Sequence, residues 1–399
     1  MNNFADEKIN LDALKKKAFN FRWAEVEDGI IPLTAADPDY PCAEAIKKAM
    51  AEYIEDGYFS YTPRMGLKEF KESFSRYVKR RKNEDINPEL VLPIDSAARA
   101  MFEIAQTFLK PGDEMIVFDP CDFLFREACI SAGATPVCAP VSIDTSTRKM
   151  DLTAIEKVIT PNTKMLGLCN PHNPYGLTYT KEELDYIMSL CEKNDILIMN
   201  DEIWSDIIYP DAQFNSIYCL GNKRCDRVLS LFGYSKSFGL AGLRIGCMYT
   251  TDKEKFDKLV NKSQVMNTAG GATSLSQVAA IAAMNETEDW FNELIDHLTS
   301  NRDYAVDFIN KIPHLHAYKP MGTYLLYVDI SELGMSGAEF TAYLQEKVKL
   351  AIIPGGHQFF GDMSEGHVRI CIATSNGILK EGLNRLKKGV ELLIEEKSL

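Results

Sequence analysis

The sequence predicts an α/β protein whose mostly parallel central sheet is sandwiched by helices, with a smaller α+β domain built from both termini. The length of 399 residues favours two folding units over one. Short apolar runs alternate with helical patterns between residues 97 and 231, which is typical of βαβ units and a parallel sheet. After about residue 250 the pattern is mainly helical, and the chain closes with a mixed unit of strands and helices.

The periodicity of apolar residues predicts each element in turn. Residues 1–40 show no regular period, and helices are then expected from Pro41 to Gly57 and from about residue 66 to residue 81. A strand turns into a helix near residue 96. The alternating region predicts helices at 97–109, 121–132 and 181–194, and strands at 114–118, 135–139, 164–169, 196–200 and 227–231. The last unit predicts strands near 324–328 and 368–372, and helices around 337–348 and 380–396. We expect residues 1–50 and 288–399 to form the small domain and residues 51–287 the large one.

Composition excludes several classes of protein. The net charge of −13 disfavours nucleic acid as a partner, and the one basic run, Lys79–Lys82, suits the end of a helix. Ten cysteines without a Cys-x-x-Cys pair favour free thiols in a reducing compartment, and the six histidines offer no metal cluster. The first residues lack a signal-peptide pattern, and no apolar stretch has the length of a membrane span. We therefore expect a cytoplasmic protein that binds neither membranes nor metal.

Three polar residues follow predicted strands, at the edge where open α/β sheets bind ligands. They are Asn173, Asp201 and Lys236. Lys236 stands between two serines and is followed by two glycines and Arg244, an arrangement that suits covalent binding of an aldehyde cofactor and clamping of its phosphate. A lone lysine is most often a solvated surface group, so this hypothesis depends on partners elsewhere in the chain.

Other segments supply such partners, each with an ordinary structural alternative. Asp201 ends a buried strand, where a carboxylate needs a cationic partner such as a protonated ring nitrogen, or else it caps the next helix. Asn173 lies between two prolines that fix its direction, although the string also suits a plain turn. Small residues at 96–98 leave N–H groups open for an anion. Arg369, in an apolar strand, suits bidentate binding of a carboxylate or an edge-strand ion pair.

Taken in order, these motifs resemble the class I/II aminotransferases, which are fold-type-I enzymes dependent on pyridoxal 5′-phosphate. The resemblance covers nearly the whole chain. Its strings are Ala-Ala-Asp-Pro-Asp-Tyr-Pro (35–41), Asn-Pro-His-Asn-Pro-Tyr-Gly (170–176), Asp-Glu-Ile-Trp (201–204), Ser-Lys-Ser-Phe-Gly-Leu-Ala-Gly-Leu-Arg-Ile-Gly (235–246) and Val-Arg-Ile-Cys-Ile-Ala-Thr-Ser (368–375).

The resemblance implies a role for each cofactor-binding residue. Lys236 forms a Schiff base with pyridoxal phosphate and acts as general base, and Asp201 pairs with the ring nitrogen. Asn173 donates to the ring oxygen. The implied phosphate contacts are the side chain of Arg244, the backbone amides of Ala97 and Ala98, Ser235, and Tyr61 of a second subunit.

The resemblance also implies the reaction and the assembly. The amino group of an L-amino acid passes to a 2-oxo acid, while Arg369 and Asn173 bind the substrate and the backbone near Ala36 closes over it. The family forms homodimers with two shared active sites. We find no arginine that would clearly bind a second carboxylate, so a preference for aspartate is not predicted.

Three positions depart from the family pattern. Gly233 stands where the family often has a serine, three residues before the lysine. Trp204, which we count among the cofactor-binding residues, stands where the family usually has a tyrosine that donates to the ring oxygen. Asp122 stands where an aromatic residue usually stacks on the ring, and we expect Phe123, one place further on, to stack there instead.

A second branch of these enzymes competes for the assignment. Cystathionine β-lyase-like C–S lyases carry strings similar to those at 169–174, 201–206 and 322–325, but generally lack the arginine eight residues past the lysine. Arg244 therefore favours an aminotransferase. A non-catalytic regulator with this fold is a third possibility, which the acidic balance and the lack of an appended DNA-binding segment oppose. Lys236 would remove the same α-proton in transamination and in β-elimination, so the side-chain pocket decides between them.

Overall fold

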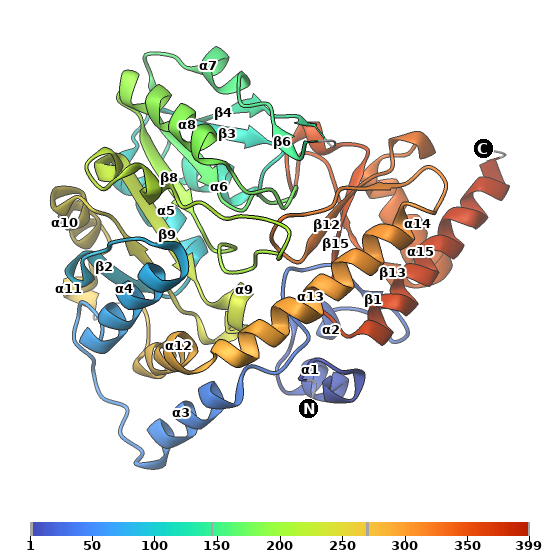
Figure 1. Ribbon diagram of the computed structural model, residues 1–399, viewed down its shortest axis with the longest axis horizontal. Helices are drawn as coiled ribbons and strands as arrows, with labels where there is room; N and C mark the ends of the chain where they lie inside the picture. Colours follow the sequence, from blue (N-terminus) through green and yellow to red (C-terminus); the bar gives the residue numbers. More distant parts are fainter. Residues whose placement is uncertain (1–2, 145–146, 269–270, 398–399) are drawn as a thin grey trace.

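The computed structural model describes residues 3–144, 147–268 and 271–397. A seven-stranded sheet in the order β2-β10-β9-β8-β7-β3-β4 forms the centre of the larger part (Figure 1). All of its strands run parallel except β10, which pairs antiparallel with both neighbours. The strands are β2 (Val91–Ile94), β3 (Glu114–Asp119), β4 (Thr135–Pro140), β7 (Thr163–Cys169), β8 (Leu197–Asp201), β9 (Val228–Gly233) and β10 (Gly246–Tyr249).

Helices lie on both sides of this sheet (Figure 1). Two of them, α5 and α6, pack against each other and against the sheet, and α12 packs against α3 and α4. The helices of this part are α3 (Glu44–Glu55), α4 (Lys68–Lys82), α5 (Ala97–Phe108), α6 (Leu124–Ser131), α7 (Ala154–Val158), α8 (Lys181–Lys193), α9 (Ser235–Phe238), α10 (Lys253–Lys262), α11 (Val265–Thr268) and α12 (Ser274–Glu286); the short strands β5 (Ile143–Asp144) and β6 (Lys149–Met150) pair with each other.

A smaller antiparallel sheet in the order β11-β12-β15-β14 lies beside the long helices α13 and α15 (Figure 1). The N-terminal strand β1 pairs with β13 from the C-terminal third of the chain, so the two ends of the sequence meet. The elements are α1 (Leu11–Lys16), α2 (Phe21–Ala24), β1 (Ile31–Pro32), α13 (Glu288–Ile309), β11 (His316–Ala317), β12 (Leu325–Asp329), α14 (Gly337–Val348), β13 (Leu350–Ala351), β14 (Ile353–Pro354), β15 (His367–Cys371) and α15 (Asn376–Lys397). The predicted α/β fold is confirmed.

The predicted elements differ from the observed ones in several places, among them the following three. The helix expected at 121–132 begins only at Leu124, because the amides of Cys121 and Phe123 donate instead to carbonyls of residues 360 and 359, at 2.8 and 3.1 Å. Residues 1–40, expected to be irregular, contain α1 and α2, whose first turns are capped by the side chains of Asn10 and Asn20. The short antiparallel strand β10 was not predicted.

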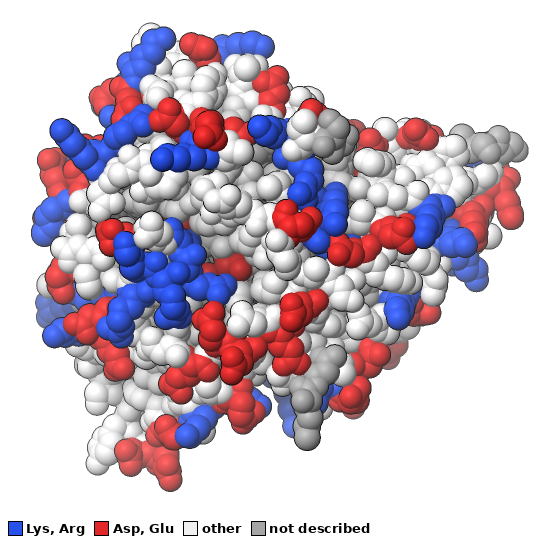
Figure 2. All heavy atoms as spheres, viewed as in Figure 1, with Lys and Arg blue, Asp and Glu red and all other residues white. Residues whose placement is uncertain are grey.

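Charged groups of both signs cover the face seen in Figure 2, and basic side chains gather over α4. The last turn of this helix is the run Lys79–Lys82, whose members pair with the carboxylates of Glu84, Asp85, Glu202 and Glu288. The residues of the basic run therefore form ion pairs within the protein, at the C-terminal end of the helix. Within the described ranges, no helix combines the length and the apolar character needed to cross a membrane.

Candidate active site

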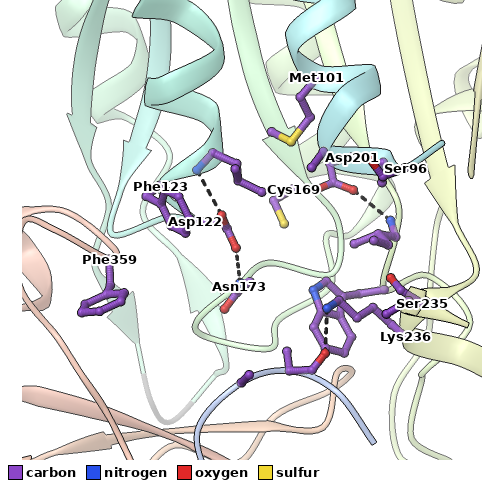
Figure 3. Close-up of a pocket in the computed structure, with 18 of the residues that line it drawn as sticks. Ser96, Met101, Asp122, Phe123, Cys169, Asn173, Asp201, Ser235, Lys236 and Phe359 are labelled. Atoms are coloured by element: carbon purple, nitrogen blue, oxygen red, sulfur yellow. Dashed lines mark hydrogen bonds between the residues drawn. The ribbon is translucent and has the colours of Figure 1, made fainter. Parts of the chain in front are cut away.

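A cavity of about 370 Å³ lies at the carboxyl ends of the parallel strands (Figure 3). The ends of β7 and β8 bring Cys169 and Asp201 to it, and α9, which follows β9, brings Lys236. The small sheet contributes Ile353 from β14 and Arg369 from β15. The cavity is therefore lined by both sheets, and segments far apart in the sequence meet there.

Every predicted site residue except Tyr61 lines this cavity. These residues are Ala36, Ala97, Ala98, Phe123, Asn173, Asp201, Trp204, Ser235, Lys236, Arg244 and Arg369. Tyr61 lies outside the lining and its side chain is 95% exposed. Phe123 is also partly exposed, at 38%, at the cavity's edge.

The amine of Lys236 lies at the centre of the polar groups. Its Nζ donates to the carbonyl oxygen of Ala36 at 2.7 Å and lies 5.5 Å from the centroid of the Trp204 ring. Burial lowers the pKa of this amine, and the nearby carboxylate of Asp37 opposes that shift. A lysine with a lowered pKa is more often neutral, which is the form that attacks a carbonyl carbon.

Asp201 is the last residue of β8 and is almost fully buried. Its Oδ1 accepts a hydrogen bond from the amide of Ile203 at 2.9 Å. Burial raises the pKa of Asp201 to about 7, because the charged carboxylate is costly away from water. A cationic N–H group bound in the cavity would compensate that cost.

A chain of hydrogen bonds joins Asp122, Asn173 and Arg369 along one side of the cavity, and Figure 3 shows the bond between Asp122 and Asn173. The amide Nδ2 of Asn173 donates to Oδ2 of Asp122 at 2.8 Å, and its Oδ1 accepts from Nη1 of Arg369 at 3.3 Å. The amide therefore has a fixed orientation, with one face toward an acid and the other toward a guanidinium.

Arg369 has no carboxylate partner among the residues that the structure describes. It is buried, its Nε has no hydrogen-bond partner in that part of the chain, and its guanidinium carbon lies 5.0 Å from the Phe360 ring centroid. Burial lowers the pKa of this side chain. An unpaired buried guanidinium is costly, so it suits a carboxylate ligand.

The N-terminus of α5 also lines the cavity. Ser96 caps the helix by accepting from the amide of Arg99 at 3.1 Å, which leaves the first two amides, those of Ala97 and Ala98, for a ligand. Arg244 also lines this region, with a backbone φ of 53° that is strained for a residue other than glycine. Its side chain makes no hydrogen bond or ion pair within the described ranges, so it is available to an anion.

Trp204 and Tyr324 pack edge to face beside Lys236, with ring centroids 4.7 Å apart. The hydroxyl of Tyr324 donates to the Ala36 carbonyl at 3.2 Å, which is the same oxygen that accepts from Lys236. Tyr324 was not predicted as a site residue, although it belongs to the Gly-Thr-Tyr-Leu string noted for the lyases. Phe359 and Phe360 were missed as well, and no local sequence signal would have found them.

Comparisons with known proteins agree with this geometry. The profile described as "Aminotransferase class I and II" matches residues 28–386. The chain is 30% identical to an aspartate aminotransferase of Pyrococcus horikoshii, over 97% of each chain. A pyridoxal phosphate-bound putative aminotransferase of Clostridium difficile superposes with a TM-score of 0.87 at 26% identity, covering 98% of this chain and 99% of that one. Cystalysin of Treponema denticola, at 24% identity and a TM-score of 0.90, shares the fold over 98% and 100% of the two chains.

The comparisons therefore confirm the predicted family and cofactor class, and they favour the aminotransferase reading. This chain belongs to the class I and II aminotransferase family, and it is a pyridoxal phosphate-dependent aminotransferase.

Proposed function

We propose that Lys236, Asp201 and Arg369 carry out the transfer of an amino group from an L-amino acid to a 2-oxo acid. The observation that carries this proposal is their convergence in one buried cavity, where an amine, a carboxyl group and an unpaired guanidinium come from three distant segments. The Lys236 amine has a lowered pKa, the Asp201 carboxyl group has a raised pKa, and the Nε of Arg369 has no hydrogen-bond partner in the described chain.

The groups around the cavity fit pyridoxal phosphate at each of its polar parts. The buried amine of Lys236 suits the aldehyde, and the carboxyl group of Asp201 suits a protonated ring nitrogen. The amide of Asn173 suits the ring oxygen. The free amides at the start of α5, with Ser235 and Arg244, suit the phosphate.

When bound, pyridoxal phosphate supplies an electron sink that stabilises negative charge at the substrate's α-carbon. Lys236 would take the proton from that carbon as a general base, and its protonated amine would then act as the general acid that delivers the proton during transfer of the amino group. Burial of its amine favours the neutral form that accepts the proton. Arg369 holds the α-carboxylate so that the α-hydrogen faces this amine, and the segment at Ala36 covers the site.

The decisive experiment uses the holoenzyme with a panel of L-amino acids and several 2-oxo acids, including pyruvate and 2-oxoglutarate. We expect the cofactor absorbance to change with at least one amino acid, and a new amino acid to form from the added 2-oxo acid. Lys236→Ala should lose both the covalent cofactor band and nearly all turnover. Absence of any half-reaction across the panel would reject the proposal.

A second candidate is C–S β-elimination, which the strings at 169–174, 201–206 and 322–325 support. The same proton transfer by Lys236 would then lead to loss of a group from the β-carbon. Release of pyruvate, ammonia and a thiol from cystathionine, without an added 2-oxo acid, would support this alternative over transamination.

We further propose that the protein is a cytoplasmic homodimer in which Tyr61 reaches the partner's cofactor phosphate. Tyr58, Phe59 and Tyr61 are 78%, 67% and 95% exposed between α3 and α4, an unusual concentration of aromatic surface that a second copy would cover. The ten free cysteines fit a reducing compartment.

A further inference from the structure

The carboxylate of Asp122 faces the cavity from the loop that precedes α6 (Figure 3). Its Oδ1 accepts from the amide of Leu124 at 3.1 Å and its Oδ2 from the Asn173 side chain at 2.8 Å. It makes no ion pair with any residue in the described part of the chain. Its negative charge acts on the ionisable groups across the cavity, which are those of Asp201, Lys236 and Arg369.

Four apolar side chains that line the cavity form what we call the apolar wall. Phe123 and Leu124 directly follow Asp122 at the start of α6, and Phe359 and Phe360 belong to the segment between β14 and β15. Backbone hydrogen bonds join the two loops, and the carboxylate of Asp119 accepts from the amides of residues 362 and 363 at 3.1 and 3.0 Å. Hydrogen bonds between the larger and the smaller part of the molecule therefore hold the apolar wall in place.

The cations that line the cavity are Lys236, Arg244 and Arg369. The proposed function uses all three, for the cofactor aldehyde, the cofactor phosphate and the substrate α-carboxylate. Among the described lining residues, none of the remaining side chains is basic, so this subunit offers a second substrate carboxylate only neutral side chains and acidic ones, Asp122 among them.

We propose that Asp122 and the apolar wall select amino acids and 2-oxo acids with an uncharged, apolar side chain and reject those with a second carboxylate. This inference rests on the proposed function, because it takes Arg369 as the site of the α-carboxylate. At an effective dielectric constant of about 20, two like charges about 6 Å apart repel enough to weaken binding about a hundredfold. The same selection applies to the amino-group acceptor, so pyruvate should be a better acceptor than 2-oxoglutarate.

The test measures binding of two five-carbon acids that carry no amino group, pentanoate and glutarate, to the holoenzyme by titration calorimetry. We expect the wild-type protein to bind pentanoate at least about tenfold more tightly than glutarate. Glutarate binding as tightly as pentanoate would overturn the inference, without recourse to any variant.

Asp122→Asn removes the charge and keeps an oxygen that accepts a hydrogen bond. It should narrow the preference for pentanoate over glutarate by about tenfold to a hundredfold. Glu127→Gln, which removes the same charge from an exposed position on α6, should leave that preference unchanged. Equal effects of the two variants would overturn the role of Asp122.

The ranking of the two acids by affinity does not depend on which reaction the enzyme catalyses. If no amino acid reacts but glutarate is rejected, the proposed transamination fails and the selectivity stands. If amino transfer occurs with glutamate as readily as with leucine, the selectivity fails and the proposed function stands.

Discussion

At the scale of single residues, the site is defined by ionisable groups removed from water. Asp201 and Arg369 are both buried, and neither has an oppositely charged partner within ion-pair distance in the described chain. Such buried groups are costly without a partner and become favourable when a ligand of the opposite charge binds. The site is therefore arranged for a cationic ring nitrogen and an anionic carboxylate.

The raised pKa of Asp201 predicts how the stability of the cofactor-free protein depends on pH. Its pKa is about 7 in the folded state, against about 4 for an unperturbed aspartate, so the folded state binds more protons between these values. Stability therefore falls as pH rises from about 4 to about 7, by up to about 4 kcal/mol from this group. Asp201→Asn should remove that fall. Denaturant unfolding at several pH values measures the free energy of unfolding of both proteins. The same dependence of this free energy on pH in wild type and variant would contradict the prediction.

Replacing Arg369 should separate binding from chemistry. Arg369→Lys keeps the charge but loses the planar fork, and Arg369→Ala loses both, so KM for the amino acid should rise about tenfold and about a hundredfold respectively. Steady-state kinetics across the amino-acid panel measure this. A primary amine that lacks the α-carboxylate should react equally slowly with all three proteins, and equal KM values for an amino acid would contradict the assigned role.

At the scale of elements, short backbone distances hold the start of α5 against β10. A side chain at Gly246 would place its Cβ 2.7 Å from the carbonyl oxygen of Phe232 and 3.0 Å from the amide nitrogen of Ala97. Both groups belong to backbone, which has little room to move. The position of the Ala97 amide, which we expect to bind the phosphate, therefore depends on a glycine in the neighbouring strand.

Gly246→Ala should displace the first turn of α5, weaken cofactor binding at least about tenfold, and destabilise the protein by about 1–3 kcal/mol. Gly242→Ala is the matched control, because nothing lies within 4 Å of its added Cβ, and it should change stability by less than about 0.5 kcal/mol. Cofactor titration and thermal unfolding measure both effects. Similar behaviour of the two variants would show that the close approach has no functional consequence.

At the scale of the whole molecule, buried contacts fasten the N-terminal segment to the C-terminal sheet. Arg22 and Asp39 form a fully buried ion pair, and Arg22 Nη1 donates to Sγ of Cys371 at 3.0 Å. The hydroxyl of Tyr40 donates to the carbonyl of Thr374 at 2.6 Å. These contacts hold residues 31–40 across the cavity, which is how the Ala36 carbonyl reaches Lys236. The division into domains at residues 50/51 and 287/288 stays a prediction.

The segment after helix α3 projects from the molecule, and the exposed aromatic residues lie in this segment (Figure 1). If this surface is the homodimer interface, changing both Tyr58 and Phe59 to Asp should give monomers at micromolar concentration and weaken cofactor binding. Ile130→Asp, at an exposed apolar position on α6, should leave the assembly intact. Size-exclusion chromatography with light scattering measures the mass, and a monomeric wild-type protein would contradict the prediction.

The sequence by itself determined the fold class and the positions of Lys236, Asp201 and Asn173 after parallel strands. Alternation of apolar strands with helices is a local signal, and it fixes which residues follow a strand and hence which edge of the sheet they reach. The family resemblance named the cofactor and gave each of these residues a role toward it or toward the substrate. The tertiary structure brings the residues around one cavity.

The surroundings of the proposed substrate side-chain pocket depend on contacts between distant segments, which the sequence did not reveal. The loop at 121–123 was predicted as helix, yet its amides bond to carbonyls more than 230 residues away, and this pairing turns Asp122 toward the cavity and brings Phe359 and Phe360 beside it. Tyr324 likewise meets Lys236 only through the shared carbonyl of Ala36. Contacts of such long range leave no trace in local periodicity, because each partner's sequence is compatible with several structures until the other is in place.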